Sequence, residues 1–496
     1  MPLIRIIILT WGIYSMFIPC HSATHELTLH DALNVHVYNT RYVKAKRLAL
    51  ANALMECENF RKSMLPALSL NLAPVSFDHS MRLLQNYITG EYSNVEEYSN
   101  TVAGGISVIQ KISATGGSLT LGSSLSYLHE FASGNNSFST APMYMSYTQP
   151  LLGGGKISKL EKAMYKLKNE IAVKDFCSSV SSEQQKILSL YLDTYFCKMD
   201  IDFYAKAVSM GDSLLMHAAI RKKAGKITEY EYSQVELQQL DSQIALEEAR
   251  SSYASSMRLL ENELALHEIT LGDISVAGFP AFIDDKLVME LVRTNSPEYQ
   301  SMEMELLNAE YSMHQAMLSS RFNGNVSLSC GLNQYAKTFK HAYTRPDMRQ
   351  ALSVTLSVPV FQWGINRNKK KMARNEYETV LIEQEQALDD FKSEIFDSVS
   401  DYNISKRLAD AAVKKYELSA RQYSFAAMRF GAGKISAAEL SASHAEHLKA
   451  KQSYMSVLKT SLVQYYKIRH LSLYDFIEGK SLAEIIPVED MTCGAK

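Results

Sequence analysis

The sequence has few of the residues that mark several common protein classes. Six cysteines occur in 496 residues, and five of them follow residue 23, an odd number without metal-ligand spacing. We therefore predict packed thiols rather than a disulfide framework or a zinc site. The formal net charge is −2, which argues against a general nucleic-acid-binding protein.

Long hydrophobic runs are also missing after the N-terminal segment. No apolar run beyond residue 23 reaches the roughly 18 residues that a membrane helix needs, so any membrane-spanning segment is predicted to be a strand. In the N-terminal segment, Arg5 precedes an apolar stretch and small residues follow it, which predicts a signal peptide over residues 1–23. Acylation of Cys20 in a lipoprotein is the alternative, which the preceding Pro19 disfavours.

The motifs of common enzyme and cofactor sites are missing as well. The Gly-Lys pairs at 225–226 and 433–434 lack the earlier glycine and the following serine or threonine of a phosphate-binding loop. No G-x-S-x-G or H-E-x-x-H sequence occurs. His444 and His447 lie three residues apart without an obvious third ligand, so we interpret them as surface histidines. The sequence predicts a protein that is not an enzyme and needs no cofactor or metal.

What the sequence does contain is an internal duplication. Residues 147–155 and 357–364 each begin as an alternating strand, break at a proline, turn at a glycine and open a long helical pattern. The segment 224–227, Ala-Gly-Lys-Ile, recurs at 432–435. A duplicated strand-to-helix unit dictates the architecture of the whole chain. The residues that we assign to the two strand-to-helix turns are Pro150, Gly155, Pro359 and Gly364.

The two copies differ in length because the first carries an insertion. Aligning the strand-to-helix turns and the helices before them leaves roughly 48 extra residues between Pro66 and Pro150. They contain two alternating stretches joined by Thr115-Gly-Gly117, which predicts a hairpin over 101–129. The sequence leaves open whether this hairpin extends into the outer aqueous space or adds wall strands.

The predicted strands have one apolar and one polar face. In 351–358, leucine and valine alternate with alanine, serine and threonine, and 325–333 follows the same pattern. A period of two fits a half-buried strand of a soluble sheet, or a barrel strand with lipid outside and water inside.

The helical patterns are too long for an ordinary globular domain. Residues 156–223 and 366–430 repeat apolar or small residues every seven positions, and a second helical pattern follows each after a glycine. Such heptads predict antiparallel helical hairpins that pack along their whole length. Four strands cannot close a barrel and open edges are excluded in lipid, so a membrane location predicts that several chains complete one barrel.

Three features carry a family resemblance: the sequence Leu-Thr-Leu-His-Asp-Ala-Leu at 27–33, the two strand-to-helix turns, and the two Gly-Lys-Ile tips. In their order, duplication and spacing, the chain resembles the TolC-like outer-membrane efflux protein family over nearly all of the mature sequence. The resemblance implies a mainly α fold with β. In such a homotrimeric channel, four β-strands per chain enter a shared 12-stranded outer-membrane barrel, and long antiparallel helices form a periplasmic α-barrel.

The mature chain is therefore predicted to contain two repeats and a C-terminal segment. The first repeat, 24–285, comprises helix 28–63, strands within 67–149, long helix 156–223 and return helix 228–266. The second repeat, 286–470, comprises helix 286–321, strands 325–335 and 350–359, long helix 366–430 and return helix 436–470. Residues 471–496 form a C-terminal periplasmic segment.

The resemblance also implies partners and sites. The partners are outer-membrane lipid of a Gram-negative bacterium, a periplasmic adaptor (membrane fusion) protein, and an inner-membrane pump of the resistance-nodulation-division (RND), ABC or major-facilitator (MFS) type. The tips implied to contact the adaptor are Gly225, Lys226, Ile227, Gly433, Lys434 and Ile435.

An acid lies six residues past each tip glycine, at Glu231 and Glu439. The resemblance implies that these carboxylates face the tunnel as gate acids. A ring of them would attract cations and raise its own pKa values through like-charge crowding. Solvated helix charges are the alternative interpretation.

Together these features predict a passive export duct that conducts small molecules or proteins from an inner-membrane pump to the exterior. The alternative is a trimeric coiled-coil surface or structural protein without transport activity. A coiled-coil adhesin would place its strands at one end of the chain, whereas here strands interrupt the helices twice. An outer-membrane enzyme would need a convergent nucleophile and base, which the sequence does not reveal.

Overall fold

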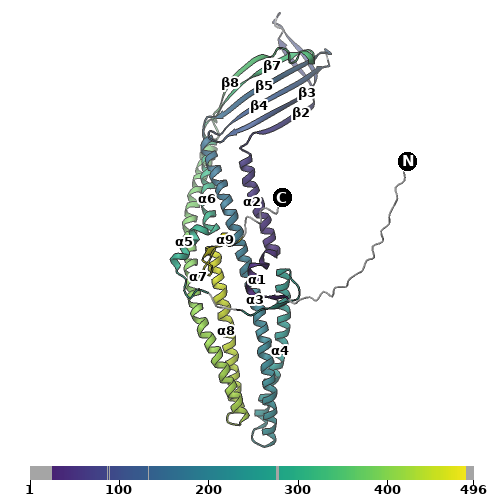
Figure 1. Ribbon diagram of the computed structural model, residues 1–496. Coiled ribbons are helices and arrows are strands. Elements are labelled where there is room, and N and C mark those ends of the chain that lie inside the picture. Colours follow the sequence, from purple (N-terminus) through teal and green to yellow (C-terminus); the bar gives the residue numbers. More distant parts are fainter. Residues whose placement is uncertain (1–24, 86–87, 89, 132, 275–278, 487–496) are drawn as a thin grey trace, which may run out of the picture. The chain divides into compact units, whose positions relative to one another are not determined.

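The structure, a computed structural model, describes residues 25–85, 88, 90–131, 133–274 and 279–486 (Figure 1). The predicted signal peptide, Cys20 and Cys493 lie outside these residues. The chain forms two compact units, each described by itself below. The first unit comprises residues 1–44, 183–279 and 405–463, and the second comprises 45–182, 280–404 and 464–496.

The second unit contains a six-stranded antiparallel sheet with the order β2-β3-β4-β5-β7-β8 (Figure 1). Its strands are β2 Ala67–Gln85, β3 Tyr92–Ile112, β4 Gly117–Glu130, β5 Asn136–Pro150, β7 Asn323–Ala336 and β8 Asp347–Ser357. The predicted strand regions are thus present, but β8 ends at Ser357 rather than at 359. Pro359 has no N–H to donate to a ladder, which favours an earlier end.

The strand count differs from the four per chain that the resemblance implied. The predicted hairpin 101–129 corresponds to β3 and β4, and both strands are paired on both sides within the one sheet. The hairpin therefore belongs to the sheet of the single chain. Among the described residues, the single chain contributes six strands to this sheet.

Two predicted single helices are broken. The first, 28–63, is α1 Leu29–Asn34, the 3₁₀ helix η1 His36–Asn39 and α2 Arg41–Lys62. Thr40 is extended, and its Oγ1 accepts the N–H of Val43, so a new helix starts there. The second, 286–321, is α5 Asp285–Asn295 and α6 Pro297–Ser319. Pro297 starts α6 because it lacks an N–H and disfavours the helical conformation at Ser296.

The long helices agree closely with their predicted ranges. They are α3 Gly154–Lys223, α4 Glu229–Leu264, α7 Ile365–Gly431 and α8 Ala437–Ser472. Ile187 of α3 and Tyr402 and Phe430 of α7 belong to the seven-residue repeats of these helices, and all three are buried, as a packed seam requires. Among the described residues, no helix combines the length and the hydropathy needed to cross a membrane.

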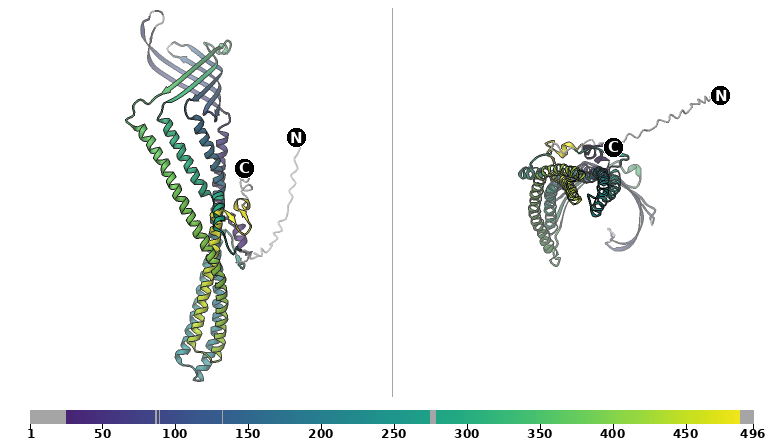
Figure 2. Two further views of the ribbon diagram at one scale, coloured as in Figure 1. Left: turned by 90° about the vertical axis from the view of Figure 1, so that its left-hand side faces the viewer. Right: turned by 90° about the horizontal axis from the view of Figure 1, so that it is seen from below.

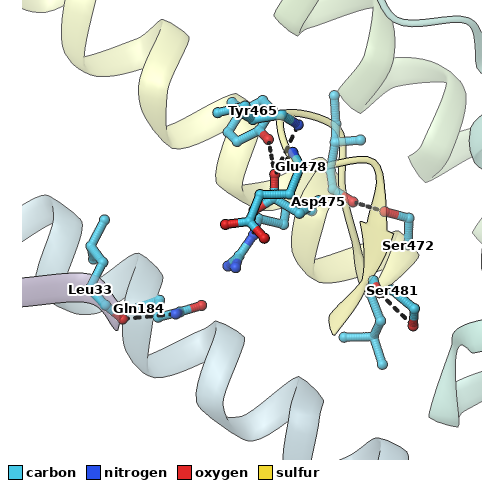
Figure 3. A network of polar contacts seen from close by, with 11 residues as sticks. Leu33, Gln184, Tyr465, Ser472, Asp475, Glu478 and Ser481 are labelled. Carbon is cyan, nitrogen blue, oxygen red and sulfur yellow. Dashed lines mark hydrogen bonds and ion pairs between the residues drawn. The ribbon is translucent and has the colours of Figure 1, made fainter. Parts of the chain in front are cut away.

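The short elements near the chain ends are fixed by buried hydrogen bonds. In the first unit, β1 His25–Leu27 pairs in parallel with β6 Ile269–Leu271. Tyr191 Oη donates to the Leu27 carbonyl at 2.9 Å. Gln184 Nε2 donates to the Leu33 carbonyl at 2.8 Å (Figure 3). The start of the described chain is thereby tied to α3.

In the second unit, the C-terminal segment contains β9 Tyr474–Asp475, β10 Lys480–Ser481 and α9 Leu482–Ile485. Its buried centre is Asp475, which accepts the Tyr465 hydroxyl at 3.0 Å and the Arg469 Nε–H at 2.8 Å (Figure 3). Burial acts to raise the pKa of Asp475, but the Arg469 charge and backbone N–H donors outweigh it and lower the pKa.

Two of the described cysteines, Cys57 and Cys177, are packed thiols as predicted, whereas Cys197 and Cys330 are half-buried. All four are free. Burial raises the pKa of Cys177 to about 12, so this thiol stays protonated at neutral pH.

Candidate channel tips and strand-to-helix junctions

The first tip connects α3 to α4 through a left-handed glycine. Gly225 has φ +68°, its N–H donates to the Lys222 carbonyl at 3.0 Å, and the Lys226 N–H donates to the Arg221 carbonyl at 2.9 Å. This pair of bonds is a Schellman motif, which satisfies carbonyls that the helix end would otherwise leave open.

The second tip, between α7 and α8, repeats this geometry. Gly433 has φ +76°, its N–H donates to the Phe430 carbonyl, and the Lys434 N–H donates to the Arg429 carbonyl, both at 2.9 Å. A residue with a β-carbon is strained at this φ, which explains glycine at both tips. Lys226 and Lys434 are exposed in the single chain.

The two return helices start with different caps. At the first tip, Thr228 Oγ1 accepts the Glu231 N–H, and the Glu231 carboxylate accepts the Thr228 N–H at 2.9 Å, a complete capping box. These bonds, the backbone one foremost, lower the pKa of Glu231. At the second tip, Ser436 Oγ accepts the Glu439 N–H at 3.2 Å. The described contacts give the exposed Glu439 carboxylate no reciprocal bond.

The first unit brings the two tips together, and Figure 2 shows the helical hairpins side by side. Ile227 and Ile435 both pack against one buried cluster, and Arg221 Nη1 donates to the Phe430 carbonyl at 3.0 Å. The equivalent positions of the repeat therefore form one end of one helical bundle. The buried cluster consists of Leu214, Ala218, Val235, Tyr423, Ala427, Phe430, Ala437 and Leu440.

Charge and aromatic contacts distinguish the first tip from the second. Lys222 forms an ion pair with Glu229 at 2.6 Å, and its Nζ lies 4.3 Å from the centroid of the Tyr232 ring. Tyr230 is 72% exposed. At the second tip Ala438 and Leu440 occupy the places of these tyrosines. The two halves therefore present different surfaces at the tips.

The first strand-to-helix turn differs in one residue from the prediction. Pro150 ends β5 as expected, but the left-handed residue is Gly153 with φ +75°, and Gly155 already lies in the first turn of α3. Glycine is required at 155 for another reason: a β-carbon there would lie 2.8 Å from the Ala114 carbonyl oxygen of the β3–β4 turn.

The second strand-to-helix turn agrees with the prediction. Pro359 follows β8, and Gly364, with φ +79°, directly precedes α7. Between them, Phe361 and Trp363 are 70% and 84% exposed, and their ring centroids lie 4.7 Å apart. Exposed aromatic residues at the end of a strand are typical of a membrane interface.

The histidine interpretation is wrong for His447, which is buried, whereas His444 is half-buried. His447 is 8% exposed, and its Nδ1 lies 3.0 Å from Ser419 Oγ. Both histidines line a cavity of about 400 Å³ between α3, α7 and α8. Burial lowers the pKa of both imidazoles. Within the described residues, no group of three or more metal-ligating side chains accompanies them.

Sequence reasoning also missed two buried charges of the first unit. Lys451 is 1% exposed and pairs with Asp200, with its Nζ 4.1 Å from the Phe203 ring centroid. Glu183 is 3% exposed. Heptad spacing predicts which helix face is buried, but it does not reveal a charged residue placed on that face.

Part of the chain is similar in sequence to a known protein family. The sequence model of the outer membrane efflux proteins matches residues 288–468. No curated protein matches the sequence significantly.

Several solved structures share the fold. The outer membrane channel CmeC of Campylobacter jejuni is 12% identical, with a TM-score of 0.65 over 94% of this chain and 89% of that one. The outer-membrane channel OprN is 14% identical, with a TM-score of 0.64 over 91% and 90%. The outer membrane protein VceC of Vibrio cholerae is 10% identical, with a TM-score of 0.59 over 92% and 96%.

The fold is therefore that of the outer-membrane channels, mainly α with β, as predicted. The second repeat matches the outer membrane efflux proteins in sequence, which confirms the resemblance to the TolC-like family. The description of the matched model, outer membrane efflux protein, is consistent with the predicted outer-membrane location.

Proposed function

We propose that the chain is the outer-membrane export duct of a tripartite efflux or type I secretion system. It conducts small molecules or proteins passively from an inner-membrane pump to the exterior. The observation that carries this proposal is a sheet with one continuous apolar face and one face of small polar residues, joined to helices with long packed seams.

The apolar face of the sheet needs a covering that the single chain does not supply. On β8, Leu352, Val354 and Leu356 are 69%, 56% and 58% exposed, and on β2 Leu68 and Leu70 are 72% and 63% exposed. Alternating strands of this kind place lipid on the apolar side and water on the polar side. A water-filled passage bounded by this sheet is the physical basis of transport.

The partners follow from the same geometry and from the family. TolC-like channels are trimeric and work with an adaptor and a pump. We propose a homotrimer here, because within the described residues the outer edges of β2 and β8 have no strand partner, and lipid does not tolerate open edges. The adaptor contact is proposed at the exposed tip residues Lys226 and Lys434 with their neighbouring glycines and isoleucines, and the pump is of the RND, ABC or MFS type.

Reconstitution of the purified full chain tests the proposal. In planar bilayers we expect stepwise ion conductance that persists without any energy source, because the duct itself is passive. Heat-denatured protein is the control for detergent leakage. A folded, membrane-inserted protein that shows no conductance, with or without added adaptor, would favour the structural coiled-coil alternative.

A further inference from the structure

The inserted strands β3 and β4 carry the same two faces as the rest of the sheet. On the apolar face, Val108 pairs with Leu121, and Leu121 pairs with Met145. The same face continues into the second repeat, where Tyr147 of β5 pairs with Leu328. The alternation of the inserted strands therefore matches that of the strands on both sides.

The opposite face is continuous in the same way. Thr120 pairs with Ser146, and Ser146 pairs with Ser329, which in turn pairs with Ala351 of β8. Small residues thus cross four strands at one level, two of them in the first repeat and two in the second. On β3 the same row reaches Ile109, and the next residue of that face, Ser107, pairs with Gly122. A hairpin that folded into the lumen or outward into water would not need this continuity.

The turn of the inserted hairpin is fixed at the edge of the sheet where the helices begin. Gln149 Nε2 donates to the Thr115 carbonyl at 2.9 Å, and Lys162 Nζ donates to Ser113 Oγ at 2.8 Å. Gly116, with φ +74°, lies so close to Gly154 that a β-carbon would be 2.6 Å from the Gly154 Cα. The inserted strands therefore start level with their neighbours and span the sheet.

The strands also have the stagger of a barrel wall. The line of paired residues that starts at Ala67, the first residue of β2, reaches β8 at Ala351, which is six residues before the last residue, Ser357. Six residues over five strand spacings correspond to a tilt on the order of 40°. Closed barrels have tilts of this size, and Figure 2 shows that the sheet is curved.

We propose that the inserted hairpin widens the outer-membrane passage, and that β8 of one copy pairs with β2 of the next to close an 18-stranded barrel from three copies. The inference rests on the proposed trimeric duct. β2 starts at the helix side and β8 ends there, so this seam is antiparallel like every other pair in the sheet. Barrel diameter grows roughly linearly with strand number, so 18 strands give about 1.5 times the diameter of 12.

In the proposed pairing of β2 with β8 of the next copy, apolar residues lie opposite apolar residues and polar residues opposite polar ones. If Ser357 lies opposite Ala67 of the next copy, Leu68, Leu70 and Leu72 of β2 face the apolar positions of β8. On the polar side, Asn71 then lies opposite Ser353. Pro74 lacks an N–H and sits at the β2 bulge between Ala73 and Ser76, a position open to proline on an edge strand. We therefore expect β2 to pair with β8 of the next copy between Ala67 and Ala73, before the bulge.

Cross-linking of the full chain in detergent and in bilayers tests the seam. The double variant Asn71→Cys with Ser353→Cys is expected to oxidise into covalent trimers, because both side chains lie on the polar face. The matched control, Asn71→Cys with Val354→Cys, places the thiols on opposite faces and should cross-link at least ten-fold less. Covalent dimers without trimers would mean a 12-stranded barrel of two copies and would overturn the proposal. Equal cross-linking of the control variant would overturn it as well.

Polymer exclusion from the outer side tests the width. A variant that lacks residues 92–130, which are β3 and β4, keeps the up-and-down order because β2 and β5 remain antiparallel. The radius of the largest polyethylene glycol that enters from the outer side should fall by about a third. An unchanged radius in a conducting deletion variant contradicts the wall role of the hairpin. If the deletion variant does not fold, cross-linking of the full chain still decides whether three copies close one barrel. Absence of conductance in the full chain would instead contradict the proposed function.

Discussion

At the scale of single residues, a buried carboxylate is the clearest departure from a simple helical seam. Glu183 of α3 is 3% exposed, and its Oε1 has no hydrogen-bond partner within the described residues. Burial and the neighbouring Glu263 raise the pKa of Glu183, while Lys186 pairs with Glu263 at 2.6 Å. A carboxyl whose pKa is raised on folding lowers stability as the pH rises above its unfolded value, near 4.5.

We predict that Glu183→Gln stabilises the protein at pH 7.5. The amide removes the buried charge. If folding raises the pKa of Glu183 by one, the ionised carboxylate lowers the free energy of unfolding at neutral pH by about 1.4 kcal/mol. Thermal unfolding at pH 5 and pH 7.5 should show a smaller loss of stability with rising pH in the variant than in the wild type. Glu263→Gln, which removes the partner of Lys186, serves as the control and should not stabilise. A lower unfolding temperature of Glu183→Gln at pH 7.5 would contradict this account.

At the scale of elements, the sequence predicts the long helices better than their breaks. Heptad spacing identifies α3, α4, α7 and α8 because many residues contribute to the same pattern. A break depends on one or two residues, such as Thr40 and Pro297, and a periodic pattern on both sides conceals it. The left-handed turn is predicted at Gly155 instead of Gly153 because three consecutive glycines do not reveal which one adopts a positive φ.

The strand count shows a second limit. Alternation within 101–129 predicts a hairpin, and the structure contains it as β3 and β4. Whether a hairpin joins a sheet depends on pairing between residues far apart in the sequence, such as Leu119 with Tyr147. Local periodicity carries no information about such pairing. The family resemblance, which implied four strands, could not supply the missing pairs either.

The tip glycines give a prediction with an internal control. Gly433→Ala should destabilise by about 1–2 kcal/mol, because a β-carbon is unfavourable at its left-handed φ of +76°. Gly431 is the last residue of α7, and a β-carbon there meets no atom within 4 Å. Gly431→Ala should therefore stabilise by about 0.5–1 kcal/mol. Chemical denaturation of both variants measures the contrast, and equal effects or the reverse order would exclude the Schellman geometry at this tip.

At the scale of the whole molecule, the duplication was the most informative sequence signal for the site. It predicts both tips, because Ala-Gly-Lys-Ile occurs at equivalent places in the two repeats. The structure then showed what equivalence does not reveal: Glu231 belongs to a capping box, whereas Glu439 does not among the described contacts. Side-chain roles diverge between repeats even where the backbone geometry is retained.

The proposed gate acids give a prediction about selectivity. The variant Glu231→Gln with Glu439→Gln should lose cation preference in a planar bilayer, because a ring of carboxylates at a narrow entrance attracts cations. The amide introduced at position 231 retains an acceptor oxygen for the Thr228 N–H, so the cap and the fold should persist. Reversal potentials in a salt gradient provide the measurement, with Glu229→Gln as the control near the same tip. Unchanged selectivity would place both acids outside the permeation path.

The proposed adaptor contact involves the exposed lysines of the two tips. Lys226 and Lys434 are exposed at the two tips that pack together in the first unit, so a cysteine at either position should cross-link to a co-expressed adaptor. We expect covalent complexes from Lys226→Cys and Lys434→Cys and none from Lys371→Cys, an exposed position near the start of α7. Mass spectrometry of the complexes would identify the adaptor and thereby the pump class. Failure at both tips, with adaptor present and the control variant equally folded, would move the docking surface away from the Gly-Lys-Ile turns.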